Sequence, residues 1–154
     1  TLKVPNSSKI YLDTAQSIRE QLKDIGITVN LEVIEWATWL SDVYTNRKYV
    51  ASLAGLAGKM EPDAILRRYT STYSKNFTNF NNAKYDALIE EAKRTSNEAK
   101  QVENYKEAQK ILAEEQAAIF LMDPNTIIAT EKGLEGFEFY PLPYLNFAKL
   151  YFKK

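Results

Sequence analysis

Residues 52–63 limit the fold of this chain most narrowly, because they run from an apolar strand through a glycine-containing loop into a helix start. Gly55 and Gly58 lack a Cβ, so backbone or ligand can approach closely there. Pro62 suits the first turn of a helix, where its missing N–H costs nothing. Open α/β sheets place ligands at the carboxyl ends of strands. The stretch predicts an α/β fold with either a ligand-binding loop or a plain strand-to-helix connection.

Composition excludes several classes of function. The 154 residues suffice for one domain with a core, and 45% of them are hydrophobic. Twenty basic residues balance twenty acidic ones, which argues against nucleic acid or an anionic membrane as partner. The chain has no Cys and no His, which excludes Cys/His zinc sites, thiol nucleophiles and Ser-His-Asp triads. No cofactor or metal is expected.

The periodicity of apolar residues predicts alternating helices and strands. Asp13, with Gln16 three residues on, is expected to cap the first helix, and Gly26 to end it. Strands are expected at 2–4, 27–33, 49–56, 118–122, 126–130, 137–140 and 145–152, and helices at 14–25, 37–47, 64–70, 83–95 and 97–116. The strand–helix–strand order favours parallel pairing in the first part of a mixed sheet. Residues 49–56 are apolar on both faces, which predicts a central strand.

Few residues are candidates for chemistry. Glu61 and Asp63 form an acidic pair in the loop, but Asp63 also suits a helix start through the helix dipole. Gly55, Gly58 and Lys59 match only part of the glycine and lysine spacing of a phosphate-binding loop. Lys59 is therefore either solvated or the partner of a carboxylate. Trp36 and Trp39 are either core residues or a ligand platform; Trp36, directly at the end of a strand, is the better cleft candidate.

An ordered series of short motifs carries a resemblance to a known family. The motifs are Glu35-Trp36, Gly55, Glu61-Pro62-Asp63, residues 76–82, Tyr85-Asp86, residues 105–112 and residues 134–137. In order and spacing, over essentially the whole chain, they resemble the carboxyl-terminal lobe of extracellular solute-binding protein family 5, the peptide- and nickel-binding receptors of ABC importers.

The resemblance implies a periplasmic-binding-protein-like lobe spanning 1–154, with an amino-terminal lobe missing from this sequence. It implies capture of a peptide or similar small solute between two lobes, delivery to the transmembrane permease subunits, and no catalysis. The location implied is extracytoplasmic, periplasmic or cell-surface, with lipid anchoring through an upstream segment. Thr1 in place of an initiator Met also leads us to expect a fragment. The implied ligand-binding residues are Trp36, Leu56, Gly58, Lys59, Met60 and Asp63.

The chain departs from the family pattern at the expected site. Peptide receptors of the family usually carry Trp where Leu56 stands, followed by an Asp for the peptide α-amine. Here Lys59 and Met60 occupy that neighbourhood, which predicts either a preference for anionic ligands or an apolar wall. Two other functions remain open: the ligand-sensing domain of a transcriptional or signalling regulator, and a hydrolase that uses Glu61 and Asp63.

Overall fold

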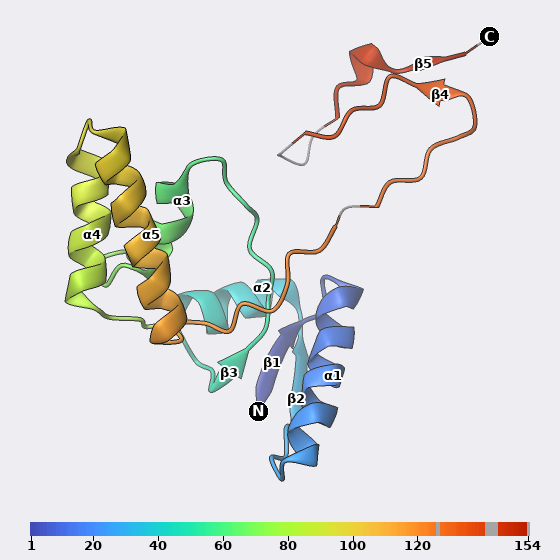
Figure 1. The fold of residues 1–154 in the computed structure, drawn as a ribbon. Helices are drawn as coiled ribbons and strands as arrows, with labels where there is room; N and C mark the ends of the chain where they lie inside the picture. Colours follow the sequence, from blue (N-terminus) through green and yellow to red (C-terminus); the bar gives the residue numbers. More distant parts are fainter. Residues whose placement is uncertain (126, 141–144, 154) are drawn as a thin grey trace. The chain divides into compact units, whose positions relative to one another are not determined.

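The computed structural model describes residues 1–125, 127–140 and 145–153 and divides into two compact units (Figure 1). Unit 1 comprises Thr1–Ala57 and Arg68–Asn81, and unit 2 comprises Gly58–Arg67 and Asn82–Lys154. The predicted mixed α/β class, with a parallel sheet in its first part, is confirmed. No described helix is both long enough and apolar enough to cross a membrane.

Unit 1 is built on a small parallel sheet. Its strands are β1 (Leu2–Pro5), β2 (Leu31–Ile34) and β3 (Ala51–Ser52), in the order β2-β1-β3. β1 pairs with β2 on one side, where Leu2 lies opposite Leu31, and with β3 on the other side, where Leu2 lies opposite Ala51. The prediction that 49–56 forms a central strand is wrong, because the second crossover carries the chain back past β1 to the free edge. The short strand β1 is therefore central, and Val4 is fully buried.

Helix α1 (Lys9–Asp24) begins earlier than predicted. Ser8, in extended conformation, is the N-cap residue, so Asp13 lies inside the helix and pairs with Lys9 at 2.5 Å. The predicted cap at Asp13 is therefore wrong. The stop at Gly26 is confirmed: its φ of 82° needs a residue without a Cβ, and its N–H donates to the Lys23 carbonyl at 2.9 Å.

The second helical segment is confirmed, with an unexpected geometry. It starts as α2 (Trp36–Thr38) and continues as the π-helix η1 (Trp39–Thr45). The strand before it, β2, is shorter than the predicted 27–33, and Ile27 is half exposed. The core of unit 1 forms where α1 packs on β1 and β2, around Leu2, Val4 and Ala15.

Residues 70–81 form an irregular loop, and a buried side-chain amide organises it. Asn76, only 4% exposed, donates from Nδ2 to the carbonyls of Tyr69, Thr70 and Phe80 at 3.3, 3.1 and 2.8 Å. A buried side-chain amide with these acceptors fixes the loop without regular secondary structure.

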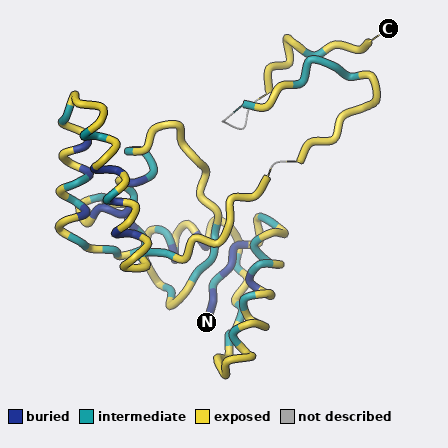
Figure 2. The backbone as a smooth tube through the Cα atoms, in the orientation of Figure 1, coloured by how far each residue is buried: buried dark blue, intermediate teal, exposed yellow. Residues whose placement is uncertain are grey.

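Three helices form the core of unit 2: α3 (Pro62–Leu66), α4 (Ala83–Arg94) and α5 (Glu98–Glu114). The 3-10 helix η2 (Arg67–Tyr69) follows α3. Asn82 and Asn97 cap α4 and α5 through their side-chain oxygens, and Pro62 lies in the first turn of α3 as predicted. Figure 2 shows buried positions on both α4 and α5. The buried hydrophobic residues of these two helices are Tyr85, Ile89, Ala92, Tyr105, Ala108, Ile111 and Leu112.

The strands predicted at 118–122 and 126–130 are absent from the described residues of that segment; Thr126 lies outside them. Ile119 is 80% exposed, Phe120 62% and Ile127 92%, so these apolar side chains are not buried. The prediction failed because a strand needs a neighbouring strand, and none is paired with the described residues of this segment.

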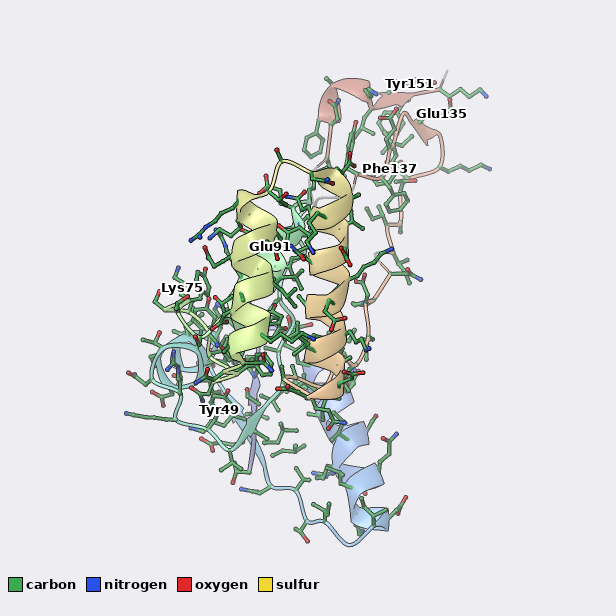
Figure 3. All side chains as sticks on the ribbon, turned by 60° about the vertical axis from the view of Figure 1, so that its left-hand side comes forward. Tyr49, Lys75, Glu91, Glu135, Phe137 and Tyr151 are labelled. Atoms are coloured by element: carbon green, nitrogen blue, oxygen red, sulfur yellow. The ribbon has the colours of Figure 1, made fainter. Side chains whose placement is uncertain are left out.

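A short antiparallel hairpin closes the described chain. β4 (Leu134–Glu135) pairs with β5 (Tyr151–Phe152), after the 3-10 helix η3 (Phe147–Lys149), and Tyr151 Oη donates to Glu135 Oε2 at 2.8 Å (Figure 3). The strand predicted at 137–140 is wrong, and of 145–152 only the last two residues are strand. Residues 141–144, between these two predicted strands, lie outside the described residues.

Candidate functional site

The strands of unit 1 end at one edge of the sheet, because all three run parallel. Asn6 follows β1, Glu35 follows β2, and residues 53–57 follow β3. The Asn6 N–H donates to the Ile34 carbonyl at 2.9 Å, and its Nδ2 donates to Glu35 Oε1 at 2.6 Å. The carboxyl edge thus carries polar groups from two adjacent strands, in the place where open α/β sheets bind ligands.

Two tryptophans stack at this edge. The rings of Trp36 and Trp39 lie 5.0 Å apart at an angle of 6°. Trp39 is 1% exposed and Trp36 is 37% exposed. Trp39 is therefore a core residue, while Trp36 covers it and keeps part of its ring accessible.

Hydrogen bonds to the sheet hold the ring of Trp39, the buried member of this stack. Trp39 Nε1 donates to Ser52 Oγ at 2.9 Å, and Ser52 Oγ donates to the Lys3 carbonyl at 2.8 Å. Phe77 packs edge-on against Trp39 at 5.7 Å. Since Trp39 is held by β1, β3 and the 70–81 loop, the ring of Trp36 rests on a rigid base.

In the loop after β3, another part of the chain approaches Gly55 closely, as predicted. A Cβ on Gly55 would lie 2.7 Å from the Tyr11 hydroxyl, so α1 approaches the loop where a side chain is missing. Leu56, the next residue, is 43% exposed. At Gly58 an added Cβ would meet nothing within 4 Å, so no other part of the described chain approaches closely there, and the approach of a ligand stays a prediction.

The other predicted residues belong to unit 2. Gly58, Lys59 and Met60 are exposed, Met60 at 68%. Asp63 lies in the first turn of α3 and forms an ion pair with Arg67 at 3.7 Å, while its Oδ1 is buried without a hydrogen-bond partner among the described groups. The pKa of Tyr105 on α5 is raised, mainly by burial and further by the Asp63 charge. Asp63 thus acts electrostatically on the helices of its own unit.

The six predicted site residues are divided between the units, with Trp36 and Leu56 in unit 1 and the other four in unit 2. Their common role in ligand binding stays a prediction. Sequence reasoning missed Asn6, Glu35 and Ser52 as parts of the sheet edge. A polar residue directly after β1 and after β2 was the available signal for Asn6 and Glu35, whereas Ser52 lies within β3. Across the described ranges, no group of three or more acidic side chains is placed to hold a metal ion.

Comparison with known proteins places the chain in a family. The sequence pattern described as "Bacterial extracellular solute-binding proteins, family 5 Middle" matches residues 1–77. The oligopeptide-binding protein AppA of Bacillus subtilis (strain 168) is 31% identical over 144 residues, which are 92% of this chain and 26% of AppA. The periplasmic murein peptide-binding protein MppA of Escherichia coli (strain K12) is 31% identical over 71% of this chain and 20% of MppA.

Solved structures agree with this placement. The structure of AppA from Bacillus subtilis in complex with a nonapeptide superposes with a TM-score of 0.84 at 30% identity, covering 99% of this chain and 31% of that one. DppA from Helicobacter pylori in complex with the peptide STSA shares the fold, with a TM-score of 0.80 at 22% identity over 99% of this chain and 31% of that one. The chain thus spans 26% and 20% of the two curated relatives. It belongs to the bacterial extracellular solute-binding proteins of family 5.

Proposed function

We propose that this chain is the carboxyl-terminal ligand-binding lobe of a two-lobe receptor that captures a peptide or similar small solute for an ABC importer. The observation that carries the proposal is the half-exposed Trp36 ring, stacked on the immobilised Trp39 at the carboxyl edge of the sheet. AppA and MppA, named as peptide-binding proteins, support the ligand class. The other lobe, the permease subunits and an extracytoplasmic, lipid-anchored location belong to the same proposal.

Binding without catalysis is the chemistry that fits the site. A hydrolase using Glu61 and Asp63 would need two carboxylates free to act on a substrate. Asp63 instead forms an ion pair with Arg67 and influences Tyr105. The relatives are likewise named as binding proteins. A flat aromatic ring at a sheet edge offers apolar contact area to peptides of different sequences, which suits a transport receptor.

For the loop in unit 2, we propose that Lys59 binds a carboxylate of the solute. Lys59 is exposed, so its ammonium group is accessible to a carboxylate of a solute. Met60, 68% exposed, is the alternative contact and would supply an adaptable apolar surface. Titration of Lys59→Ala in the complete receptor decides between them: weakened binding of a free peptide, with no change for its carboxyl-amidated form, identifies Lys59 as the partner. Unchanged affinity leaves Met60 as the contact.

Calorimetric titration of the complete receptor with di-, tri- and nonapeptides of mixed Ala, Gly and Ser composition tests the main proposal. Trp36→Ala is expected to weaken binding about tenfold, because a buried aromatic contact is lost. Trp36→Phe should restore most of it. Ile25→Ala is the control, since Ile25 is 71% exposed at the amino-terminal edge of the sheet. Failure of every peptide to bind would contradict the ligand class; unchanged binding by Trp36→Ala would contradict the site.

A further inference from the structure

Glu35 has an environment unlike that of several other carboxylates of unit 1. Glu20 pairs with Arg19, Glu32 with Lys3, and Asp13 with Lys9. Glu35 has no ion pair among the residues that the structure describes; its side chain accepts a hydrogen bond from the neutral amide of Asn6, at 2.6 Å. An amide donor orients a carboxylate without cancelling its charge, and the carboxylate keeps most of its acceptor capacity.

The backbone position of Glu35 makes this contact informative. Glu35 is the N-cap residue of α2, in extended conformation with φ −62° and ψ 148°, but its side chain makes no capping bond. Short N-cap side chains such as Asn and Asp accept from the first N–H groups of their own helix, whereas the longer Glu35 side chain does not do so here. The carboxylate is instead held by Asn6, which follows the neighbouring strand β1. Two strand ends thus fix an exposed negative group at the edge of the sheet.

The next residue supplies a second group with the same preference. The Trp36 ring rests on Trp39 and is 37% exposed. An indole face attracts cations through its quadrupole. A carboxylate and a partly exposed indole on consecutive residues therefore favour the same class of ligand group.

We propose that Glu35, oriented by Asn6 and adjacent to Trp36, binds a primary ammonium group of the solute. The inference rests on the proposed function and adds a charge preference to it. Two sources of ammonium exist in a peptide, the α-amine and a lysine side chain. Both would form a charge-assisted hydrogen bond with Glu35, so the source is left to the experiment.

The test is calorimetric titration of the complete receptor with three peptides: Ala-Lys-Ala, Ala-norleucine-Ala and N-acetyl-Ala-norleucine-Ala. Glu35→Gln is expected to weaken binding about tenfold where an ammonium is bound. If the lysine side chain is bound, only Ala-Lys-Ala weakens. If the α-amine is bound, both free peptides weaken and the acetylated one does not. Asn6→Leu, which removes the orienting donor, should give a smaller loss on the same peptides.

Glu32→Gln is the matched control, because it removes the same charge from β2, the strand that precedes Glu35, where Glu32 pairs with Lys3 at 3.8 Å. It should change none of the three affinities. The proposal is overturned if Glu35→Gln leaves all three peptides unaffected, or weakens the acetylated peptide as much as the others. If the wild-type receptor binds none of the three peptides, the proposed peptide function fails first, and this inference fails with it.

Discussion

Similar apolar residues are buried in helices α4 and α5 but exposed in the segment 115–130. Ile89 on α4 is fully buried, whereas Ile119, thirty residues later, is 80% exposed. A helix satisfies its backbone groups within itself and needs only one partner face. A strand needs another strand for every hydrogen bond. The helical pair packs within this chain, while 115–130 carries apolar side chains such as Ile119 and Ile127 that are 80% and 92% exposed.

The largest expected effect separates these two regions directly. Ile89→Ala should destabilise the chain by about 2–5 kcal/mol, because it leaves a cavity between α4 and α5. Ile119→Ala makes the same chemical change at an exposed site and should alter stability little. Urea unfolding followed by circular dichroism at 222 nm measures both. Equal losses in the two variants would show that residue 119 is buried in solution.

The hairpin provides a second test, because its strands do find a partner within the chain. A Cβ on Gly136 would lie 1.8 Å from the Lys149 carbonyl oxygen, at a φ of 82°. Gly136→Ala should therefore cost about 1–3 kcal/mol of hairpin stability. Gly58→Ala is the control, since an added Cβ there meets no atom within 4 Å. Hydrogen exchange of the Lys153 amide, which donates to Gly133, reports on the hairpin; unchanged protection would contradict the close contact.

The N-terminal cap of α5 is expected to contribute less to stability than the buried Ile89 side chain. Asn97 Oδ1 accepts from the Lys100 N–H at 3.1 Å. Asn97→Ala should lower stability by about 1 kcal/mol, whereas Asn97→Asp keeps the acceptor and should restore it. Thermal unfolding compares the two variants. If both lose the same stability, the cap contributes nothing and tertiary packing alone holds the start of α5.

The smallest expected effect concerns the exposed ion pair between α4 and α5. Lys84 Nζ donates to Glu107 Oε1 at 2.7 Å, which lowers the pKa of Glu107 and raises that of Lys84. Because the folded pKa of Glu107 is depressed, the stabilisation is present above the usual glutamate pKa of about 4.3 and is lost as pH falls through the folded value. The melting-temperature difference between wild type and Lys84→Met should shrink in that range. A pH-independent difference would assign the effect of Lys84 to packing.

The same contrast explains what the sequence could predict. Helices α4 and α5 were located within about two residues, because the spacing of their apolar residues is regular. The parallel pairing of β1 and β2 followed from the strand–helix–strand order. The central position of β1 did not, since four residues give little periodicity. Strands after residue 117 were mispredicted because β-propensity says nothing about whether a partner strand is present.

The edge of the sheet was only partly predictable for a related reason. Trp36 stood out as a large side chain at a strand end, and it is 37% exposed; its position in a cleft stays a prediction. The hydrogen bond between Asn6 and Glu35 joins residues 29 positions apart and depends on the β1–β2 register. Single residues can therefore be proposed from the sequence, whereas their pairing needs the structure.

The stacked indoles also have an optical consequence. The 154 residues contain two tryptophans, and both are in the stack. All tryptophan emission from this chain therefore originates at one edge of one unit, without any label. Near-parallel indoles 5.0 Å apart should also couple their electronic transitions and give an intense near-ultraviolet dichroism band. Loss of that band on heating, compared with the helical signal at 222 nm, would reveal whether unit 1 unfolds separately from the helices of unit 2.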